Sequence, residues 1–212
     1  MKVLSYLISA SLFLSLPSSG LTASDDIAAI TSVSGTATIK RPGVADLIVA
    51  VKGSSLRVAD EVRTADGGKC QITMKDDSFI NLGPKSVVHI NQYTFNEQSG
   101  RRTAVIQLIH GFCRIVIYKV RTMDSIFRVE AEPASIFVDG FADIAIHVSA
   151  ENADAAVLQG GLRMRNRLPY IVGEAWLKEN QRATISGKAP PSSPGILTER
   201  ERQGILRTGS GS

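Results

Sequence analysis

Residues that enzymes commonly use for chemistry are few and dispersed in this sequence. Three histidines, His89, His110 and His147, are scattered through 212 residues, and the two cysteines are Cys70 and Cys113. Their spacing matches no metal-ligand pattern and no CxxC motif, and it does not gather the partners of a catalytic triad. We therefore expect no enzymatic activity, no catalytic residues, no metal site and no cofactor.

Aromatic residues are also scarce, at 6% of the chain. This argues against the aromatic-lined cleft of a paired-carboxylate glycosidase. Nucleic acid is not an expected partner, because the net charge of +4 is spread along the chain rather than clustered. Some basic side chains could line a face toward an anionic envelope polymer, although solvated strand positions explain them more simply: Arg101, Arg102, Arg114, Lys119, Arg121, Arg163, Arg165 and Arg167.

Two pairs of adjacent carboxylates, Asp60-Glu61 and Asp76-Asp77, invite comparison with a calcium site. Calcium takes at least six oxygen ligands, and the sequence has no DxDxDG loop to supply them. Aspartate side chains commonly accept hydrogen bonds from nearby backbone amides and so shape turns. We expect that structural role for both pairs.

The N-terminus has the pattern of a targeting segment. Met1-Lys2 gives a positive start, Val3–Leu16 is an apolar run without charge, and Leu21-Thr22-Ala23 supplies small residues for cleavage. We predict a secretory signal peptide over residues 1–23, with an uncleaved membrane anchor as the alternative. No second apolar stretch approaches the length of a spanning helix, so no stable membrane insertion is expected after cleavage.

The cysteines leave two alternatives open. Cys70 is in register with Ile72 and Cys113 with Ile115, so both side chains are expected to face a core. They are either two buried thiols that pack as small hydrophobic groups or one disulfide, Cys70–Cys113, which a secreted protein allows.

The remaining pattern predicts an all-β fold. Cys70–Met74 and Phe79–Leu82 read as a hairpin around an acidic turn, and Ala142–Val148 alternates cleanly. Short strands separated by glycine-bearing turns, with Gly111 and Gly160-Gly161 among these turns, predict a solenoid-like or rolled β domain of short strands. We place this domain at residues 30–186.

The C-terminal segment has a different composition. Ala189–Gly195 is rich in proline and serine, so residues 187–212 are expected to form a linker and a flexible tail, which is either mobile or loosely docked. One short helix is a candidate within it, over Thr198–Leu206, with Thr198 as its cap.

Short motifs follow one another between Ile30 and Ile185: Val33-Ser34-Gly35-Thr36, Asp60-Glu61-Val62-Arg63-Thr64, Asp76-Asp77-Ser78, Leu82-Gly83, Phe127-Arg128-Val129, Val138-Asp139-Gly140 and Val157-Leu158-Gln159-Gly160. In order and spacing these motifs resemble the FecR domain. The chain departs from the family pattern at three positions where glycine is usual, which hold Ala59, Asp77 and Asn180. Asp and Asn tolerate a left-handed backbone, so two of these departures are compatible with the same turns.

The resemblance implies an all-β domain of the bacterial periplasm. In iron-transport regulators such domains lie outside a membrane helix that carries an anti-sigma segment, and they receive a signal from an outer-membrane transporter. Only Met1-Lys2 precedes the apolar run here, so we expect a stand-alone module without that segment. The leading hypothesis is a periplasmic or secreted, non-enzymatic binding or scaffolding module for an envelope protein or polymer. The alternative is a sensory or regulatory component that relays an envelope signal to a membrane partner.

Overall fold

The computed structural model describes residues 26–118 and 124–210. The predicted signal peptide lies outside these residues, as do Lys119 and Arg121 of the proposed basic face. Within the described ranges, no helix is long and apolar enough to cross a membrane.

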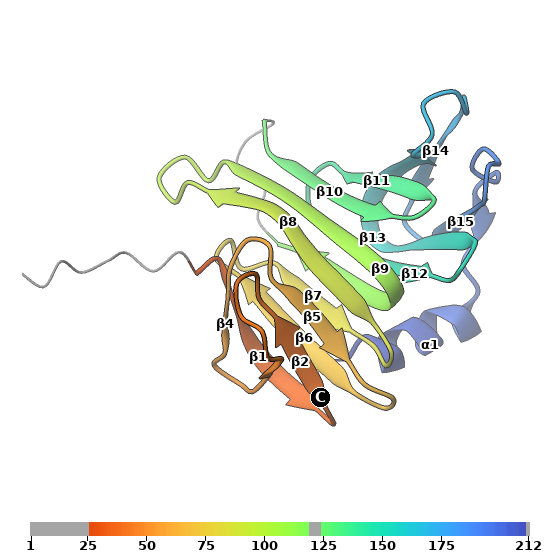
Figure 1. Cartoon of the computed structure of the whole chain (residues 1–212). Helices are drawn as coiled ribbons and strands as arrows, with labels where there is room; N and C mark the ends of the chain where they lie inside the picture. The colour runs from red at the N-terminus through yellow and green to blue at the C-terminus, as the bar shows by residue number, and fades with distance from the viewer. Residues whose placement is uncertain (1–25, 119–123, 211–212) are drawn as a thin grey trace, which may run out of the picture.

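The described chain is mostly β, which confirms the predicted class (Figure 1). Its strands are β1 (Ala28–Ser34), β2 (Ala37–Lys40), β3 (Ile48–Val49), β4 (Ser55–Leu56), β5 (Glu61–Thr64), β6 (Lys69–Met74), β7 (Phe79–Leu82), β8 (Val87–Phe95), β9 (Arg102–Ile117), β10 (Ile126–Ala131), β11 (Ala134–Val138), β12 (Ala142–Val148), β13 (Asn152–Asn166), β14 (Glu174–Lys178), β15 (Gln181–Ser186) and β16 (Gly195–Ile196). One helix, α1 (Glu199–Thr208), follows them.

The strands form two sheets that share β9 and β13. Sheet A runs in the order β4–β1–β6–β7–β9–β12–β13–β15–β16. Sheet B runs in the order β3–β2–β5–β8–β9–β10–β11–β13–β14. The pairing of β9 with β10 is parallel, and the other pairings are antiparallel. This arrangement is not a clear solenoid, because the strands pair within two sheets instead of stacking as successive coils.

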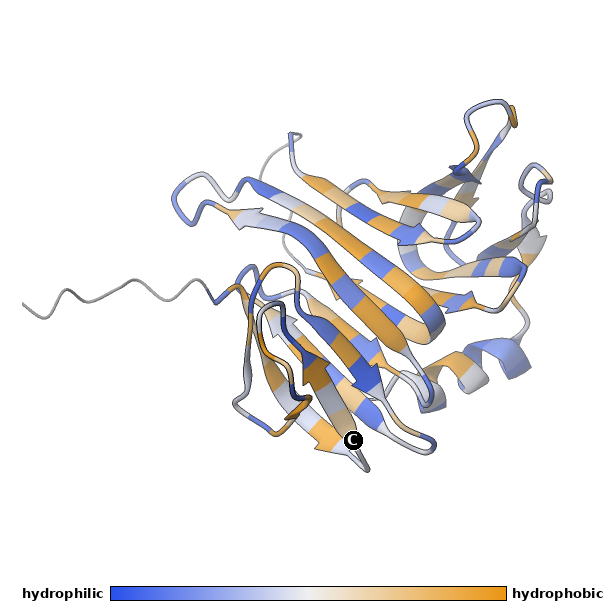
Figure 2. Ribbon diagram, viewed as in Figure 1, coloured by the Kyte–Doolittle hydropathy of each residue, from blue (hydrophilic) through white to orange (hydrophobic). Residues whose placement is uncertain are grey.

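One hydrophobic core contains inward-facing side chains from both sheets. Figure 2 shows the bands of high and low hydropathy that alternate along β8 and β9. Alternation of this kind buries one face of each strand and leaves the other face polar. The predicted strands Phe79–Leu82 and Ala142–Val148 are confirmed with those bounds.

Gly111 and Gly160 do not reverse the chain as expected. Both lie inside a continuous strand, at φ +90° and +81°, where β9 and β13 bend from one sheet into the other. At these bends the inward-facing positions shift by one residue, for example from Ala104, Ile106 and Leu108 to Cys113, Ile115 and Ile117 in β9. Glycine alone predicts a reversal at these positions, because a bend and a reversal need the same left-handed backbone freedom.

The expected flexible tail is corrected by the structure. The linker is held against the domain, because the Asn166 side-chain amide donates to the carbonyls of Gly187 and Ala189 at 2.9 Å each. The predicted helix forms as α1, and the Lys69 ammonium donates to the carbonyl of Arg207 at 2.9 Å. Low sequence complexity did not reveal these long-range contacts, which depend on residues far away in the chain.

Cys70 and Cys113 are both buried and unbonded. Leu82 lies between them, paired with Cys70 on one side and with Cys113 on the other. Two strand spacings amount to about 9.5 Å, whereas a disulfide needs Cα atoms less than about 7 Å apart. This register favours the two-thiol alternative.

We predict that the non-reduced protein has two titratable thiols after denaturation and resists alkylation while folded. Burial raises the pKa of each thiol to about 12, so the reactive thiolate is scarce in the native state below that pH. Alkylation followed by mass spectrometry, with and without denaturant, measures both quantities. An intact mass lacking two hydrogens would contradict the assignment.

Gly111→Ala is predicted to destabilise the fold by about 3 kcal/mol or more, because the new Cβ would lie 2.5 Å from the Lys85 carbonyl oxygen in a left-handed backbone. Gly195→Ala is the control, since its Cβ would have only one neighbour, at 4.0 Å. Denaturant unfolding of the two variants measures the difference, and equal free energies of unfolding would contradict the role of the bend.

Candidate functional site

Asp60 is a structural carboxylate. It is fully buried, and the Arg41 guanidinium donates to it through Nε at 2.9 Å and Nη2 at 2.7 Å. The backbone amide of Arg57 also donates to it at 2.9 Å. The hydrogen bond with Asp60 raises the pKa of Arg41, while burial opposes this shift. This pairing satisfies Asp60 internally and fixes the turn that precedes β5, as the turn-shaping prediction requires.

Asp76 is satisfied in a similar way. Its carboxylate forms an ion pair with buried Arg102 and accepts hydrogen bonds from the hydroxyls of Ser78, at 2.8 Å, and Tyr93, at 3.1 Å. Burial and the nearby carboxylate raise the pKa of the Tyr93 phenol. The guanidinium of Arg102 also lies 5.3 Å from the Phe127 ring centroid. The acidic turn is therefore tied to β8 and β9 rather than open to an ion.

The remaining sequence candidates do not converge. His89 lies in β8, His110 is exposed at the β9 bend, and His147 faces outward from β12, as predicted. No group of three potential ligand side chains surrounds a metal position within residues 26–118 and 124–210. Two members of the proposed basic face are paired with carboxylates, Arg102 with Asp76 and Arg114 with Asp143. Two others, Arg163 and Arg165, come together over the ring of Phe137.

The three departures from family glycines share one conformation. Ala59, Asp77 and Asn180 have φ of 70°, 64° and 61°, in the left-handed region. Each position thus keeps the turn that glycine would allow. Asp77 and Asn180 tolerate it, whereas Ala59 has no polar side chain to compensate.

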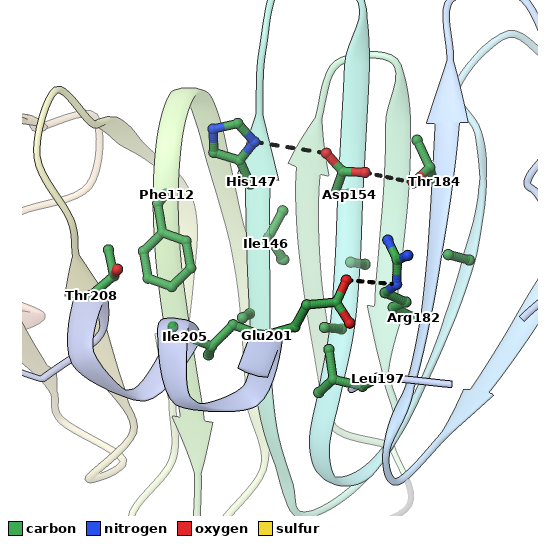
Figure 3. Close-up of a pocket in the computed structure, with 15 residues that line it drawn as sticks. Phe112, Ile146, His147, Asp154, Arg182, Thr184, Leu197, Glu201, Ile205 and Thr208 are labelled. Carbon is green, nitrogen blue, oxygen red and sulfur yellow. Dashed lines mark hydrogen bonds and ion pairs between the residues drawn. The ribbon is translucent and has the colours of Figure 1, made fainter. Parts of the chain in front are cut away.

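A groove lies between sheet A and α1 (Figure 3). Its volume is about 300 Å³. The floor is apolar and built from small residues of β12, β13 and β15, and the side walls come from β9, the segment before α1, and α1 itself. The lining residues are Phe112, Ala145, Ile146, His147, Asp154, Ala155, Ala156, Arg182, Ala183, Thr184, Leu197, Glu201, Gly204, Ile205 and Thr208.

The rim of the groove is polar on two sides. On one side Thr184 donates to Asp154 at 2.5 Å, and His147 Nδ1 lies 3.7 Å from the same carboxylate. On the other side Arg182 and Glu201 form an ion pair at 3.3 Å. The threonine hydroxyl contacts the aspartate and not the histidine, so this trio lacks the nucleophile-to-base contact of a hydrolase triad.

The helix that forms the wall is fixed at both ends. At its start, Thr198 and Glu201 form a reciprocal capping box. The side-chain contact with Thr198 lowers the pKa of Glu201, since it stabilises the carboxylate. At its end, Thr208 packs so closely on Gly83 that a Cβ there would lie 2.9 Å from the threonine methyl. The family motif Leu82-Gly83 therefore provides the contact surface for the C-terminal helix.

Residues 60–163 match the family model described as FecR protein. This segment of the chain belongs to the FecR family. The match spans the Asp60 turn, the acidic turn at Asp76 and both bent strands as far as Arg163, so the resemblance drawn from the motifs is confirmed. No curated protein matches the sequence of this FecR protein.

Two crystal structures of a candidate anti-sigma factor from Parabacteroides distasonis ATCC 8503 have a similar fold, each with a TM-score of 0.55. They are 13% and 14% identical to the FecR protein and cover 69% of it. The FecR protein in turn covers 63% and 64% of those chains, which is less than two thirds of their length. Likeness at this identity concerns the fold.

Sequence reasoning missed the groove and the arginine partners of the two aspartates. Thr198 followed by Glu201 three residues later was a readable capping signal, and it marks where the groove wall begins. The pairing of Arg41 with Asp60 left no local signal, because it joins residues 19 positions apart through the fold.

Ala59→Gly is predicted to stabilise the FecR protein by about 1 kcal/mol. The left-handed backbone costs an L-residue about 1–2 kcal/mol, and the added flexibility of glycine offsets part of the gain. Ala65→Gly, at a neighbouring position without positive φ, should destabilise instead. Thermal and denaturant unfolding measure both changes, and a destabilised Ala59→Gly protein would contradict the strain argument.

Proposed function

We propose that this FecR protein is a non-enzymatic binding module of a regulatory system in the bacterial cell envelope, located in the periplasm or secreted. The groove between α1 and sheet A would receive a short apolar segment of a protein partner. The observation that carries the proposal is the combination of an apolar floor with the polar rim of Asp154 and Arg182. Such a composition supplies burial for one or two side chains and hydrogen-bonding groups for the backbone beside them.

Family membership supports the regulatory part of this proposal. The FecR model matches the chain, and the structural neighbours are described as anti-sigma factors. The targeting pattern at the N-terminus supports the envelope location. The non-enzymatic assignment rests on the internally satisfied Asp60 and Asp76 and on the geometry of His147, Asp154 and Thr184, which does not activate a nucleophile.

A protein segment fits the groove better than a long polymer. The volume of about 300 Å³ is at the lower end of small-molecule sites, which suits one or two side chains. The ion pair between Arg182 and Glu201 leaves no single-sign charge on that side of the rim to attract a polyanion. A scaffold for an anionic polymer would need a face of unpaired positive charge, whereas Arg102, Arg114 and Arg163 are each paired with a carboxylate.

Gly204 offers a direct test, because a Cβ added there meets no atom within 4 Å and projects from a helix. Gly204→Trp is predicted to fill the groove and weaken partner binding at least about tenfold, as expected when an apolar anchor loses its site. Gly204→Ala is the matched control: it should keep binding and stabilise α1 by up to about 1 kcal/mol.

The partner is identified first by photo-crosslinking in the native bacterium from position 147 on the rim, with position 172, an exposed loop residue, as the control. Titration of the purified partner then compares the two Gly204 variants. Equal affinities for both variants, or a crosslink that forms from position 172 and not from 147, would contradict the groove as the binding site.

A further inference from the structure

The edges of the two sheets differ in length. Sheet A ends at β4 and β16, and sheet B ends on one side at β3; each of these strands has two residues. The fourth edge is β14, with five residues, and among the described residues it pairs with no strand other than β13. Short edge strands protect a sheet against pairing with another chain, and a longer free edge invites it.

The outward face of β14 carries a large exposed aromatic side chain between two charged residues. Trp176, the single tryptophan of the chain, is 62% exposed at its centre. It closes a row across three neighbouring strands in which Arg163 lies between two rings, 4.6 Å from the Phe137 centroid and 5.3 Å from that of Trp176. These contacts hold the indole in place. A large aromatic side chain that is both fixed and exposed is a typical anchor of a protein interface.

The sequence of β14 is complementary to itself. Glu174, Ala175, Trp176, Leu177 and Lys178 alternate between the exposed and the buried face, with Trp176 in the middle. If two copies pair antiparallel with Trp176 opposite Trp176, position 174 of one copy lies opposite position 178 of the other. Each glutamate then faces a lysine on the exposed face, and each Ala175 faces Leu177 on the core face.

We propose that this protein forms a two-fold symmetric dimer through β14, which joins sheet B of two copies into one continuous sheet. An interface of this kind uses the same patch on both copies and needs no second surface. The backbone amide of Lys178 already donates to the Gln181 side chain at 2.9 Å. Other backbone groups along the edge gain partners in the dimer, the two indoles cover each other, and two Glu174–Lys178 contacts form by symmetry.

A second copy fits this edge better than an anionic polymer does. Three of the arginines on this face already pair with carboxylates: Arg163 with Glu174 at 3.0 Å, Arg128 with Glu130 at 2.8 Å, and Arg167 with Glu130 at 3.0 Å. The charges at the two ends of β14 are of opposite sign, which matches a reversed copy of the same strand and not a chain of uniform charge.

Concentration-dependent analytical ultracentrifugation of the purified protein tests the dimer, with tryptophan emission recorded over the same range. We expect dimers to dominate at about 100 µM and the emission to shift to the blue as they form, since dimerisation removes water from the only indole. Trp176→Glu should be monomeric throughout. Val49→Lys, at an equally exposed apolar position on the β3 edge, should dimerise like the wild type.

Charge exchange tests the register. Glu174→Lys and Lys178→Glu each place like charges opposite one another twice, so each variant alone should dimerise at least about tenfold more weakly. An equimolar mixture of the two variants restores both opposite-charge contacts and should recover the dimer. Circular dichroism of each variant checks the fold, because Glu174→Lys also removes the ion pair with Arg163.

The proposal is overturned by a wild-type protein that stays monomeric at 100 µM, or by a dimer that Trp176→Glu leaves intact. A dimer dissociated by Val49→Lys and not by Trp176→Glu would place the interface on another edge. A mixture of the two charge variants that stays monomeric would exclude the antiparallel register centred on Trp176.

Discussion

The fold depends on two strands that have to serve both sheets. β9 and β13 enter one sheet, bend at Gly111 and Gly160, and continue in the other. Each bend shifts the inward-facing positions by one residue, so that both halves of a strand still point into the same core. A side chain at either glycine would collide with backbone atoms of the neighbouring segment, at 2.5 Å for Gly111 and 2.2 Å for Gly160. The hydrophobic core between the two sheets can form because this shift is possible.

Two buried carboxylates hold the turns around that core. Asp60 and Asp76 each accept hydrogen bonds from an arginine and from groups close to them in sequence. Removing one partner from a buried pair of this kind is costly, because the remaining charge loses its hydration without compensation. The motifs that define the FecR resemblance are therefore positions of backbone geometry and charge pairing. They identify the family through its architecture. The groove lies elsewhere, on the outer face of sheet A, which α1 covers.

Local patterns were enough to predict much of the fold. The alternation in Ala142–Val148 and the acidic hairpin gave strands that the structure confirms, because burial of one face imposes period two. Glycine alone did not distinguish a bend from a reversal at Gly111, although the shift in apolar positions around it carried that information. The groove and the free edge of β14 depend on which distant segments meet. Neither the contact of α1 with Gly83 nor the exposure of Trp176 has a local signal in the sequence.

The contact between α1 and Gly83 affects the order in which the protein folds. The last described helix contacts Lys69 in β6 and Gly83 directly after β7, so segments far apart in the chain close against each other. A contact between Lys69 and Arg207 spans 138 positions. Contacts of such separation form late, because the intervening chain has to lose its freedom before they stabilise anything. The outer face of sheet A therefore stays uncovered until α1 docks, and until then its alanine-rich floor is exposed.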